Sequence, residues 1–333
     1  MNNKQWTVGV THLIKPPFDP ELAGFDGRAD ILYFNSTDES SFDKEWLKSI
    51  DAFLVWTPAI SDRTICHLDK CKIVVRYGVG VDNVDLKGLN NSGIAFSNNP
   101  EYGPEDVADT AVAMLLSLQR RIVEHDYKAR QYADTWQENH LSPTRHSRHS
   151  TVGVIGVGRI GISVINRIRA FGYRIVGYDP YVSNGMFRAL AIERADSLAE
   201  LVKQSELVTL HCPLTDETRA MINDDVVNRA KPGMILVNTA RGGLIESLDV
   251  IHAGLRSGQL AGAGLDVIPD EPPVAHPLIE AWRAGVDWLQ GRLIITPHNA
   301  FFSDHSMYDC RYKAAETARL FLENGIHRNA VTS

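Results

Sequence analysis

The stretch Thr151-Val-Gly-Val-Ile-Gly-Val-Gly-Arg-Ile-Gly161 decides the fold class of this chain. Residues 151–155 are mostly apolar and β-branched, which predicts a buried central strand of a parallel sheet. The strand leads into a Gly-x-Gly-x-x-Gly turn. In that turn Gly156 permits the tight bend, Gly158 lets the backbone approach a pyrophosphate, and Gly161 allows close packing of helix on strand.

A helix and a second strand complete this motif. Residues 159–171 carry apolar side chains at helical spacing, so the first N–H groups of the helix would face phosphates. The strand 173–178 then ends at Asp179, about 20 residues beyond the turn, where a carboxylate can bind an adenine ribose. The pattern predicts a dinucleotide site. A structural glycine turn in another α/β protein, or a site for FAD or another adenosine ligand, is the alternative.

Length and composition set the class of protein. At 333 residues the chain can form two domains, and 44% hydrophobic with 23% charged residues is typical of a globular protein. A formal net charge of −7 argues against general nucleic-acid binding, which requires a basic surface. It does not exclude an anionic substrate. Salt screens the field of the net negative charge, so one desolvated arginine at a binding site can outweigh it.

The cysteines and the N-terminus indicate a reducing compartment. Cys66, Cys71, Cys212 and Cys310 show no metal-ligand spacing, so free or buried thiols are expected and no metal site is predicted. The first residues, Met-Asn-Asn-Lys-Gln-Trp, lack an apolar signal core, and no apolar run approaches membrane-spanning length. We therefore expect a cytoplasmic protein without a membrane partner.

Strand and helix signals alternate along the whole chain, which predicts an α/β fold with doubly wound parallel sheets. A first block should contain about five strands, and the nucleotide-binding half should begin around the helix that follows Gly103-Pro104. The predicted strands are 7–10, 31–34, 52–55, 73–76, 94–97, 151–155, 173–178, 207–211, 234–238, 262–267 and 293–296.

Turn residues and helical patterns mark the boundary between the blocks. Asn98-Asn99-Pro100 and Gly103-Pro104 indicate a linker or turn. A strong helix follows, with acidic residues in its first turn and Arg120-Arg121 near its end. The polar segment 138–150 is interpreted as a solvated loop. Residues 304–324 predict an amphipathic helix whose role periodicity alone does not define.

Two polar segments after strands contain arginine. In the segment 76–83, closely spaced glycines could present N–H groups to an anion, although a plain turn is the better interpretation from these residues alone. In Asn238-Thr-Ala-Arg-Gly-Gly243, Arg241 follows a very apolar strand and would point across the carboxyl edge of the sheet. Its planar fork suits a substrate carboxylate and a carbonyl oxygen that gains negative charge.

Two further segments carry carboxylates and a histidine. The segment 264–273 contains three acids. Asp266 stands at a strand end and could hold a cofactor, and Glu271 lies among prolines; any of the three, Asp270 included, could also be merely solvated. His298 follows the last apolar strand. A hydride-transferring site needs one acid/base near neutral pH, which histidine can supply. Glu271 could hydrogen-bond the far nitrogen of His298 and fix its tautomer.

Together these motifs closely resemble the D-isomer-specific 2-hydroxyacid dehydrogenases. The resemblance runs from about residue 55 to 324 and keeps the order of the motifs. It implies two Rossmann- or flavodoxin-like domains with an active site in an interdomain cleft. Residues 1–102 plus 301–333 would form the substrate-binding domain, and residues 103–300 the NAD-binding Rossmann domain, which in this family usually also makes a homodimer contact.

The resemblance also implies site residues. His298 would be the acid/base, Glu271 its partner and Arg241 the substrate clamp. Further substrate-binding positions would be Val79, Gly80, Tyr102 and Phe301. The positions that match cofactor contacts are Gly156, Gly158, Arg159, Ile160, Gly161, Asp179, Cys212, Pro213, Thr218, Thr239, Ala240, Arg241 and Asp266.

The resemblance implies an NAD-dependent interconversion of a 2-keto acid and a D-2-hydroxy acid. Asp179 favours NAD over NADP, because a carboxylate there would repel a 2′-phosphate. Formate dehydrogenases normally carry Gln where Glu271 stands, which counts against that activity. We expect a small or medium 2-keto acid as substrate. The alternative is an NAD-responsive binding protein of the C-terminal-binding-protein type with little turnover.

Overall fold

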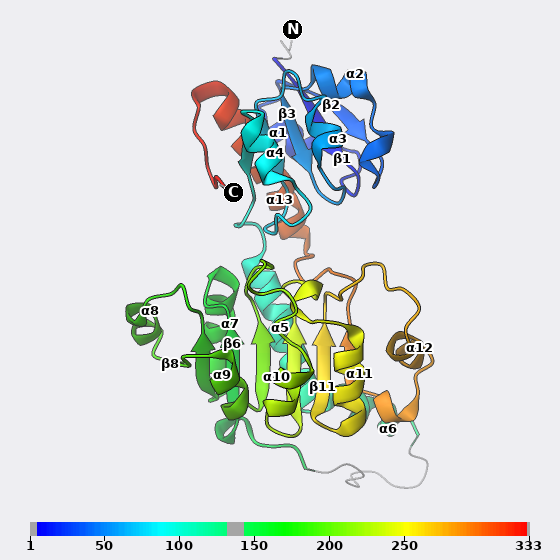
Figure 1. Cartoon of the computed structure of the whole chain (residues 1–333), viewed down its shortest axis with the longest axis vertical. Coiled ribbons are helices and arrows are strands. Elements are labelled where there is room, and N and C mark those ends of the chain that lie inside the picture. Colours follow the sequence, from blue (N-terminus) through cyan, green and yellow to red (C-terminus); the bar gives the residue numbers. More distant parts are fainter. Residues whose placement is uncertain (1–4, 132–142, 332–333) are drawn as a thin grey trace. The chain divides into compact units, whose positions relative to one another are not determined.

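The computed structural model describes residues 5–131 and 143–331 of the chain. Its contacts divide the chain into unit 1, residues 1–103 with 302–333, and unit 2, residues 104–301. Each unit is built around its own parallel sheet (Figure 1). Of the predicted loop 138–150, residues 138–142 lie outside the described residues, and a short 3-10 turn occupies Ser147–His149.

Unit 1 contains a five-stranded parallel sheet in the order β2-β1-β3-β4-β5. The strands are β1 (Trp6–Thr11), β2 (Ala29–Phe34), β3 (Ala52–Val55), β4 (Ile73–Arg76) and β5 (Ala95–Ser97). Two apolar clusters fill its two faces, and β3 contributes to both, with Leu54 in one and Phe53 in the other. The sheet is therefore buried on both sides, as parallel sheets require.

The helices of unit 1 lie between these strands and after the last of them. They are α1 (Asp19–Gly24), α2 (Lys44–Ser49), α3 (Asp62–Ile65), α4 (Leu86–Asn91) and α13 (Asp304–Asn324), with a 3-10 turn at Glu39–Ser41. Helix α13 packs against α1 and β4. Gly24 makes the close approach possible, because a Cβ there would lie 2.6 Å from the Cβ of Ala315.

Unit 2 contains a seven-stranded parallel sheet in the order β12-β11-β10-β9-β6-β7-β8. The strands are β6 (Thr151–Ile155), β7 (Arg174–Tyr178), β8 (Glu193–Arg194), β9 (Leu207–Leu210), β10 (Met234–Asn238), β11 (Leu260–Leu265) and β12 (Leu293–Ile295). The first strand of the unit, β6, is central, and the order of strands reverses beside it. This is the arrangement that places a ligand crevice outside the carboxyl ends of the strands.

Helices cover both faces of the larger sheet. They are α5 (Pro104–Gln119), α6 (Ile122–Ala129), α7 (Arg159–Arg169), α8 (Asn184–Ala189), α9 (Leu198–Gln204), α10 (Asp224–Arg229), α11 (Leu248–Ser257) and α12 (Pro277–Arg283), with 3-10 turns at Gly242–Leu244 and Asp287–Leu289. Alternate residues of β10 point to opposite faces. Leu236 packs with the cluster under α9, α10 and α11, and Val237 packs with the cluster under α5 and α7.

Several predicted elements agree with the structure residue for residue. They are the strands 52–55, 73–76, 151–155 and 234–238 and the helix 304–324. The other predicted strands exist with ends shifted by one or two residues. The strand β8 was not predicted, because two polar residues at a sheet edge give no apolar signal.

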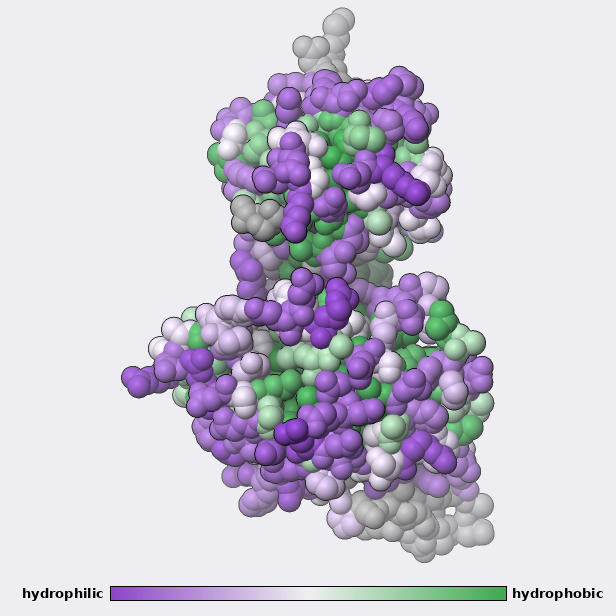
Figure 2. All heavy atoms as spheres, viewed as in Figure 1, coloured by the Kyte–Doolittle hydropathy of each residue, from purple (hydrophilic) through white to green (hydrophobic). Residues whose placement is uncertain are grey.

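Hydrophilic side chains dominate the face of the molecule seen in Figure 2, and apolar residues appear among them in small groups. Within residues 5–131 and 143–331, the structure contains no helix that combines the length and the apolar composition needed to cross a membrane.

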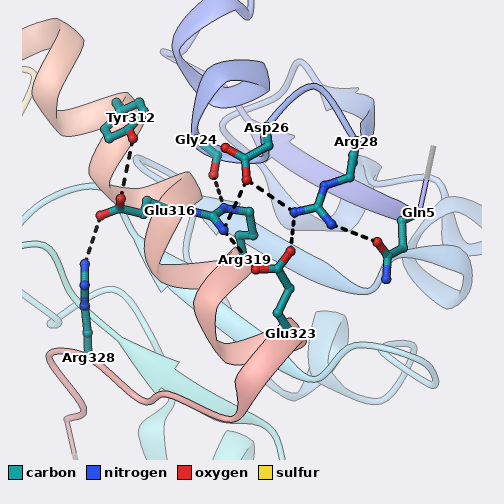
Figure 3. A network of polar contacts seen from close by, with 9 residues as sticks. All are labelled: Gln5, Gly24, Asp26, Arg28, Tyr312, Glu316, Arg319, Glu323 and Arg328. Atoms are coloured by element: carbon teal, nitrogen blue, oxygen red, sulfur yellow. Dashed lines mark hydrogen bonds and ion pairs between the residues drawn. The ribbon is translucent and has the colours of Figure 1, made fainter. Parts of the chain in front are cut away.

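A polar network ties α13 to the N-terminal part of unit 1 (Figure 3). Arg319 donates from Nε to the carbonyl of Gly24 at 2.7 Å and pairs with Glu323 at 2.9 Å. Glu323 also pairs with Arg28, which lies just before β2. The long helix at the end of the chain is thus an integral part of the first sheet's domain.

A buried ion pair also joins α1 and α13. The Glu21 carboxylate, which is 0% exposed, accepts from Arg311 Nε at 2.8 Å and Nη2 at 2.6 Å. The hydroxyl of Tyr77 donates to the same carboxylate at 3.0 Å. All three contacts cross between elements far apart in the sequence.

Replacing Arg311 by Met should destabilise unit 1 by about 3–5 kcal/mol, because Glu21 would remain as a buried charge without its cation. Urea unfolding followed by circular dichroism measures the loss. The double variant Glu21→Gln/Arg311→Met should lose less than the sum of the single changes. Unfolding of Arg311→Met at the wild-type midpoint would contradict a paired, buried Glu21.

Candidate active site

The glycine turn after β6 has the geometry of a phosphate-binding turn. Gly156 has φ +90°, and a Cβ there would lie 2.6 Å from the backbone nitrogen of Cys212. A Cβ at Gly161 would lie 2.0 Å from the carbonyl oxygen of Gly156, so only glycine lets α7 pack this closely. A Cβ at Gly158 would meet no atom within 4 Å. The space above Gly158 is open to a ligand.

The start of α7 offers hydrogen-bond donors to that space. Gly158 is the N-cap residue, and no side chain caps the first N–H groups, at Arg159 and Ile160. Unsatisfied N–H groups and the helix dipole both favour an anion there. Asp179, at the end of β7, accepts from the N–H of Val157 at 2.9 Å and of Tyr181 at 3.0 Å. These bonds fix its carboxylate beside the turn.

Two polar atoms at the same sheet edge are buried and have no partner among the described residues. They are Nδ1 of His211, after β9, and Oγ1 of Thr239, after β10. Nε2 of His211 is 2.9 Å from the hydroxyl of Thr209, and burial lowers the pKa of His211 to about 3. A buried polar atom without a partner is expected where a ligand completes the site.

The loop after β9 contains the other predicted cofactor positions of this region. Thr218 donates to the carbonyl of Pro213 at 2.7 Å and accepts from the N–H of Thr215 at 2.8 Å. Burial raises the pKa of Cys212 to about 11, so this thiol stays protonated. Cys212 is therefore a packing residue at the edge of the turn rather than a nucleophile.

Arg241 stands in a turn built by Asn238, whose side chain is fully buried. The Asn238 amide donates to the carbonyl of Arg241 at 2.8 Å and accepts from the N–H of Ala240 at 3.0 Å. A Cβ at Gly242 would lie 1.8 Å from the carbonyl oxygen of Ile268. Glycine at 242 is therefore required for the loop after β10, which carries Arg241, to pack on the loop that carries Glu271.

Glu271 and His298 form a hydrogen-bonded pair. Oε2 of Glu271 lies 2.7 Å from Nδ1 of His298, and Oε1 accepts from the N–H of Ile268 at 3.0 Å. The side chains are 36% and 43% exposed. Nε2 of His298 has no hydrogen-bond partner in the part of the chain described. The pair thus presents one imidazole nitrogen for proton transfer while a carboxylate holds the other.

Asp266 determines the conformation of the turn that carries His298. Its carboxylate, in a residue only 2% exposed, accepts from Thr296 Oγ1 at 2.6 Å and from the N–H groups of Asn299 at 2.9 Å and Ala300 at 3.0 Å. Its carbonyl accepts from the N–H of His298, a residue at φ +53°. Asp266 therefore positions this turn, and the cofactor contact that the sequence predicts for it stays a prediction.

The predicted substrate positions are distributed over both units. Val79 and Gly80 lie in the turn after β4, and Tyr102 is half-buried against the apolar cluster of unit 1. Phe301 is the last residue of unit 2, half-buried, and is followed by the exposed Phe302.

Unit 2 contains Arg241, Glu271 and His298. Glu271 and His298 are hydrogen-bonded, and the loop that carries Arg241 packs against the loop that carries Glu271 at Gly242 and Ile268. Two residues with structural roles in the site were not predicted as functional. The side chain of Asn238 shapes the turn that carries Arg241, and Gly242 lets this turn pack against the carbonyl of Ile268. The sequence gives no signal for the second role, because Ile268 lies in another loop.

The depressed pKa of His211 gives unit 2 a specific dependence of stability on pH. Between about pH 6.5 and pH 3 the unfolded chain binds a proton that the folded chain does not, so the free energy of unfolding falls as the pH falls. The slope should reach at most about 1.4 kcal/mol per pH unit. Urea unfolding at several pH values gives the free energy of unfolding as a function of pH, and this free energy should change less per pH unit in His211→Asn than in the wild type. The same pH dependence in both proteins would place His211 in contact with solvent.

A family model matches this chain over residues 112–300. Its description is D-isomer specific 2-hydroxyacid dehydrogenase, NAD binding domain. The matched segment includes the glycine turn, Asp179, Arg241, Glu271 and His298, and the site geometry described above falls within it.

Individual proteins agree with this match. The chain is 36% identical to C-terminal-binding protein 1 of Caenorhabditis elegans, over 74% of this chain and 34% of that protein. It is also 36% identical to D-3-phosphoglycerate dehydrogenase of Mycobacterium leprae, over 84% of this chain and 51% of that protein. The chain thus spans between a third and about half of the length of these relatives.

A solved structure extends the similarity to both units. D-lactate dehydrogenase of Aquifex aeolicus, complexed with NAD and lactic acid, has a TM-score of 0.83 and 28% sequence identity, over 98% of this chain and 99% of that one. Because the family model covers more than half of its length, the chain belongs to the D-isomer-specific 2-hydroxyacid dehydrogenase family.

Proposed function

We propose that this protein is an NAD-dependent oxidoreductase that interconverts a 2-keto acid and a D-2-hydroxy acid. The observation that carries the proposal is the Glu271–His298 pair at 2.7 Å, with its second imidazole nitrogen available. Arg241 is joined to this pair through the contact between Gly242 and Ile268. The stereochemistry is that of the family.

The residues around the glycine turn fit NAD. The open space at Gly158 and the uncapped start of α7 would hold the pyrophosphate, and Asp179 would hold the adenine ribose. The unpartnered atoms of His211 and Thr239 lie at the carboxyl ends of the strands next to β6, where the dinucleotide is expected. The carboxylate of Asp179 favours NAD, because it would repel a 2′-phosphate. When bound, the nicotinamide supplies or accepts the hydride.

His298 moves the proton in this mechanism. In the reductive direction its Nε2 donates a proton to the 2-keto oxygen, and in the oxidative direction the same nitrogen removes the proton from the hydroxyl. Glu271 accepts from Nδ1–H, so it fixes the tautomer and stabilises the imidazolium. The turn around Asp266 keeps the imidazole in place during both steps.

Arg241 and the turn of unit 1 provide the groups for the substrate carboxylate and carbonyl. The Arg241 guanidinium would bind the carboxylate with two parallel hydrogen bonds and stabilise negative charge on the carbonyl oxygen. The N–H groups of Val79 and Gly80 would donate to the carboxylate. Tyr102 and Phe301 would contact the side group of the substrate, which favours a small or medium 2-keto acid with an apolar or aromatic side group.

A spectrophotometric assay of NADH oxidation tests the proposal. We expect turnover of at least one of glyoxylate, pyruvate, hydroxypyruvate and phenylpyruvate. His298→Ala should lower kcat by about 10²-fold or more, because the general acid is lost, while NADH still binds. The exposed His125 on α6 provides the control, since His125→Ala should keep wild-type kinetics.

Full activity of His298→Ala would remove this residue from the mechanism. NADH binding without turnover of any of these acids would instead favour an NAD-responsive binding protein, the activity class to which the similarity with C-terminal-binding protein 1 points. Faster turnover with NADPH than with NADH would overturn the role of Asp179.

Gly158→Ala should weaken NADH binding by about tenfold or more without destabilising the protein. The added methyl meets no protein atom within 4 Å but enters the space proposed for the pyrophosphate. Fluorescence titration with NADH and thermal unfolding without NADH measure the two effects. Gly161→Ala is the matched control and should lower stability, because its methyl would clash with Gly156. Wild-type NADH affinity in Gly158→Ala would place the pyrophosphate elsewhere.

We also propose that the protein is a homodimer through unit 2. The exposed apolar side chains of Ile122 and Val123 on α6 and of Phe171 after α7 support self-association of this unit. Sedimentation of the purified protein at several concentrations tests this assembly, and a monomer at all concentrations would exclude it.

A further inference from the structure

We propose that unit 2 contains a second ligand site, which binds a small organic dianion at the edge of the sheet where the strands begin. A cavity of about 630 Å³ lies at this edge. Its walls include Leu207, Ile235 and Ala261, which are the first or second residues of β9, β10 and β11. A cavity of this size is typical of sites for small molecules. The site goes beyond the proposed function and does not depend on it.

This cavity is separate from the dinucleotide site. The glycine turn follows the carboxyl end of β6, whereas Ser150, which lines the cavity, directly precedes the same strand. A strand of this length spans about 17 Å. Because all strands of the sheet are parallel, their carboxyl ends lie at one edge and the cavity lies at the other (Figure 1). A ligand in the cavity therefore does not compete with the dinucleotide for space.

Arg292 gives the cavity a cation without a counter-ion. Its Nε donates to the carbonyl of Ala261 at 3.0 Å, and its Nη1 donates to that of Trp288 at 3.2 Å. Its Nη2 donates to the carbonyls of Leu255 at 2.7 Å and Leu260 at 2.9 Å. Nowhere in the chain segments that the structure describes does a carboxylate form an ion pair with this guanidinium. Burial lowers the pKa of Arg292, so an anion placed beside it would stabilise a partly desolvated charge.

Two more cations of the cavity share a single carboxylate. Glu206 pairs with Lys231 at 2.6 Å and also with Arg145, and it accepts from the N–H of Thr151 at 2.7 Å. Burial opposes ionisation of Glu206, but the bonds from Lys231 and Thr151 hold its pKa below the usual value, so it remains a carboxylate. One negative charge thus faces two positive charges on this wall.

The charged side chains that line the cavity leave it positive. They are four basic residues, Arg121, Arg145, Lys231 and Arg292, and two acidic residues, Glu124 and Glu206. Arg121 and Glu124 form a bidentate pair with contacts of 2.7 and 2.8 Å. The formal charge of this set is +2, although the whole chain carries −7. Concave walls focus the field of such a set, and a ligand with two negative charges would balance it.

The uncharged walls define the rest of the ligand. Leu118, Leu207 and Ile235 are buried apolar residues that line the cavity. The buried amide of Gln119 donates to the hydroxyl of Ser150 at 3.2 Å, so these two polar groups already have partners. The ligand should therefore carry a short apolar body beside its charged group. Phenyl phosphate combines both features and is a dianion at pH 8, above the second pKa of a phosphate ester.

Calorimetric titration of NADH-loaded protein with phenyl phosphate tests the site, because NADH fills the phosphate-binding turn. We expect binding that weakens as the NaCl concentration rises. Lys231→Gln and Arg145→Gln should each weaken it about fivefold, and Glu206→Gln should strengthen it by a similar factor, because the charge of the cavity falls or rises by one. The Arg145 side chain is 58% exposed, so its replacement leaves the fold intact. Arg241→Gln, in the candidate active site, should bind phenyl phosphate as the wild type does.

Two further probes separate charge from apolar contact. Inorganic phosphate should bind more weakly than phenyl phosphate, and benzyl alcohol should not bind. No binding of phenyl phosphate to the wild type at millimolar concentration would overturn the proposal, as would equal affinity in the wild type, Lys231→Gln and Glu206→Gln. Loss of binding in Arg241→Gln alone would place the ligand in the active site and overturn it as well. Turnover enters none of these measurements, so they decide the second site even if the proposed function fails.

Discussion

The constraint on which unit 2 depends is that all of its strands run in the same direction. Every strand therefore ends at one edge of the sheet, and the residues that follow β6, β9, β10, β11 and β12 gather there. Helices bury both faces, so the strands must be apolar, and polar function is confined to the loops at this edge. The glycine turn, Arg241, Asp266 and His298 all follow from this single arrangement.

Parallel strands bring loops to the same edge, but they do not fix side chains to a fraction of an ångström. Two buried contacts do that here. Gly242 allows the loop that carries Arg241 to contact the carbonyl of Ile268. The carboxylate of Asp266 accepts hydrogen bonds from Thr296 before His298 and from Ala300 after it. Glu271 then bonds both Ile268 and His298. The loops that carry Arg241 and His298 are thus joined by one continuous set of contacts among backbone and buried or half-buried side-chain groups.

The sequence predicts those parts of the molecule that depend on local patterns. Continuous apolar runs define β3, β4, β6 and β10 to the residue, because a strand buried on both faces admits little else. The two polar residues of β8 carry no such pattern. Likewise, the motif order suggests that Glu271 accompanies His298, whereas the contact of Gly242 with Ile268 and the three donors to Asp266 arise only in the folded chain.

The segment 76–83 of unit 1 likewise has contacts that the sequence alone does not predict. From the residues alone, the segment 76–83 is better interpreted as a plain turn, because glycines occur in turns for many reasons. In the folded chain two of its carbonyls accept hydrogen bonds from Asn98 and Asn99, and a side chain at its first glycine, Gly78, would collide with the guanidinium of Arg76. A chain of net charge −7 attracts an anion only where such local geometry outweighs the overall field.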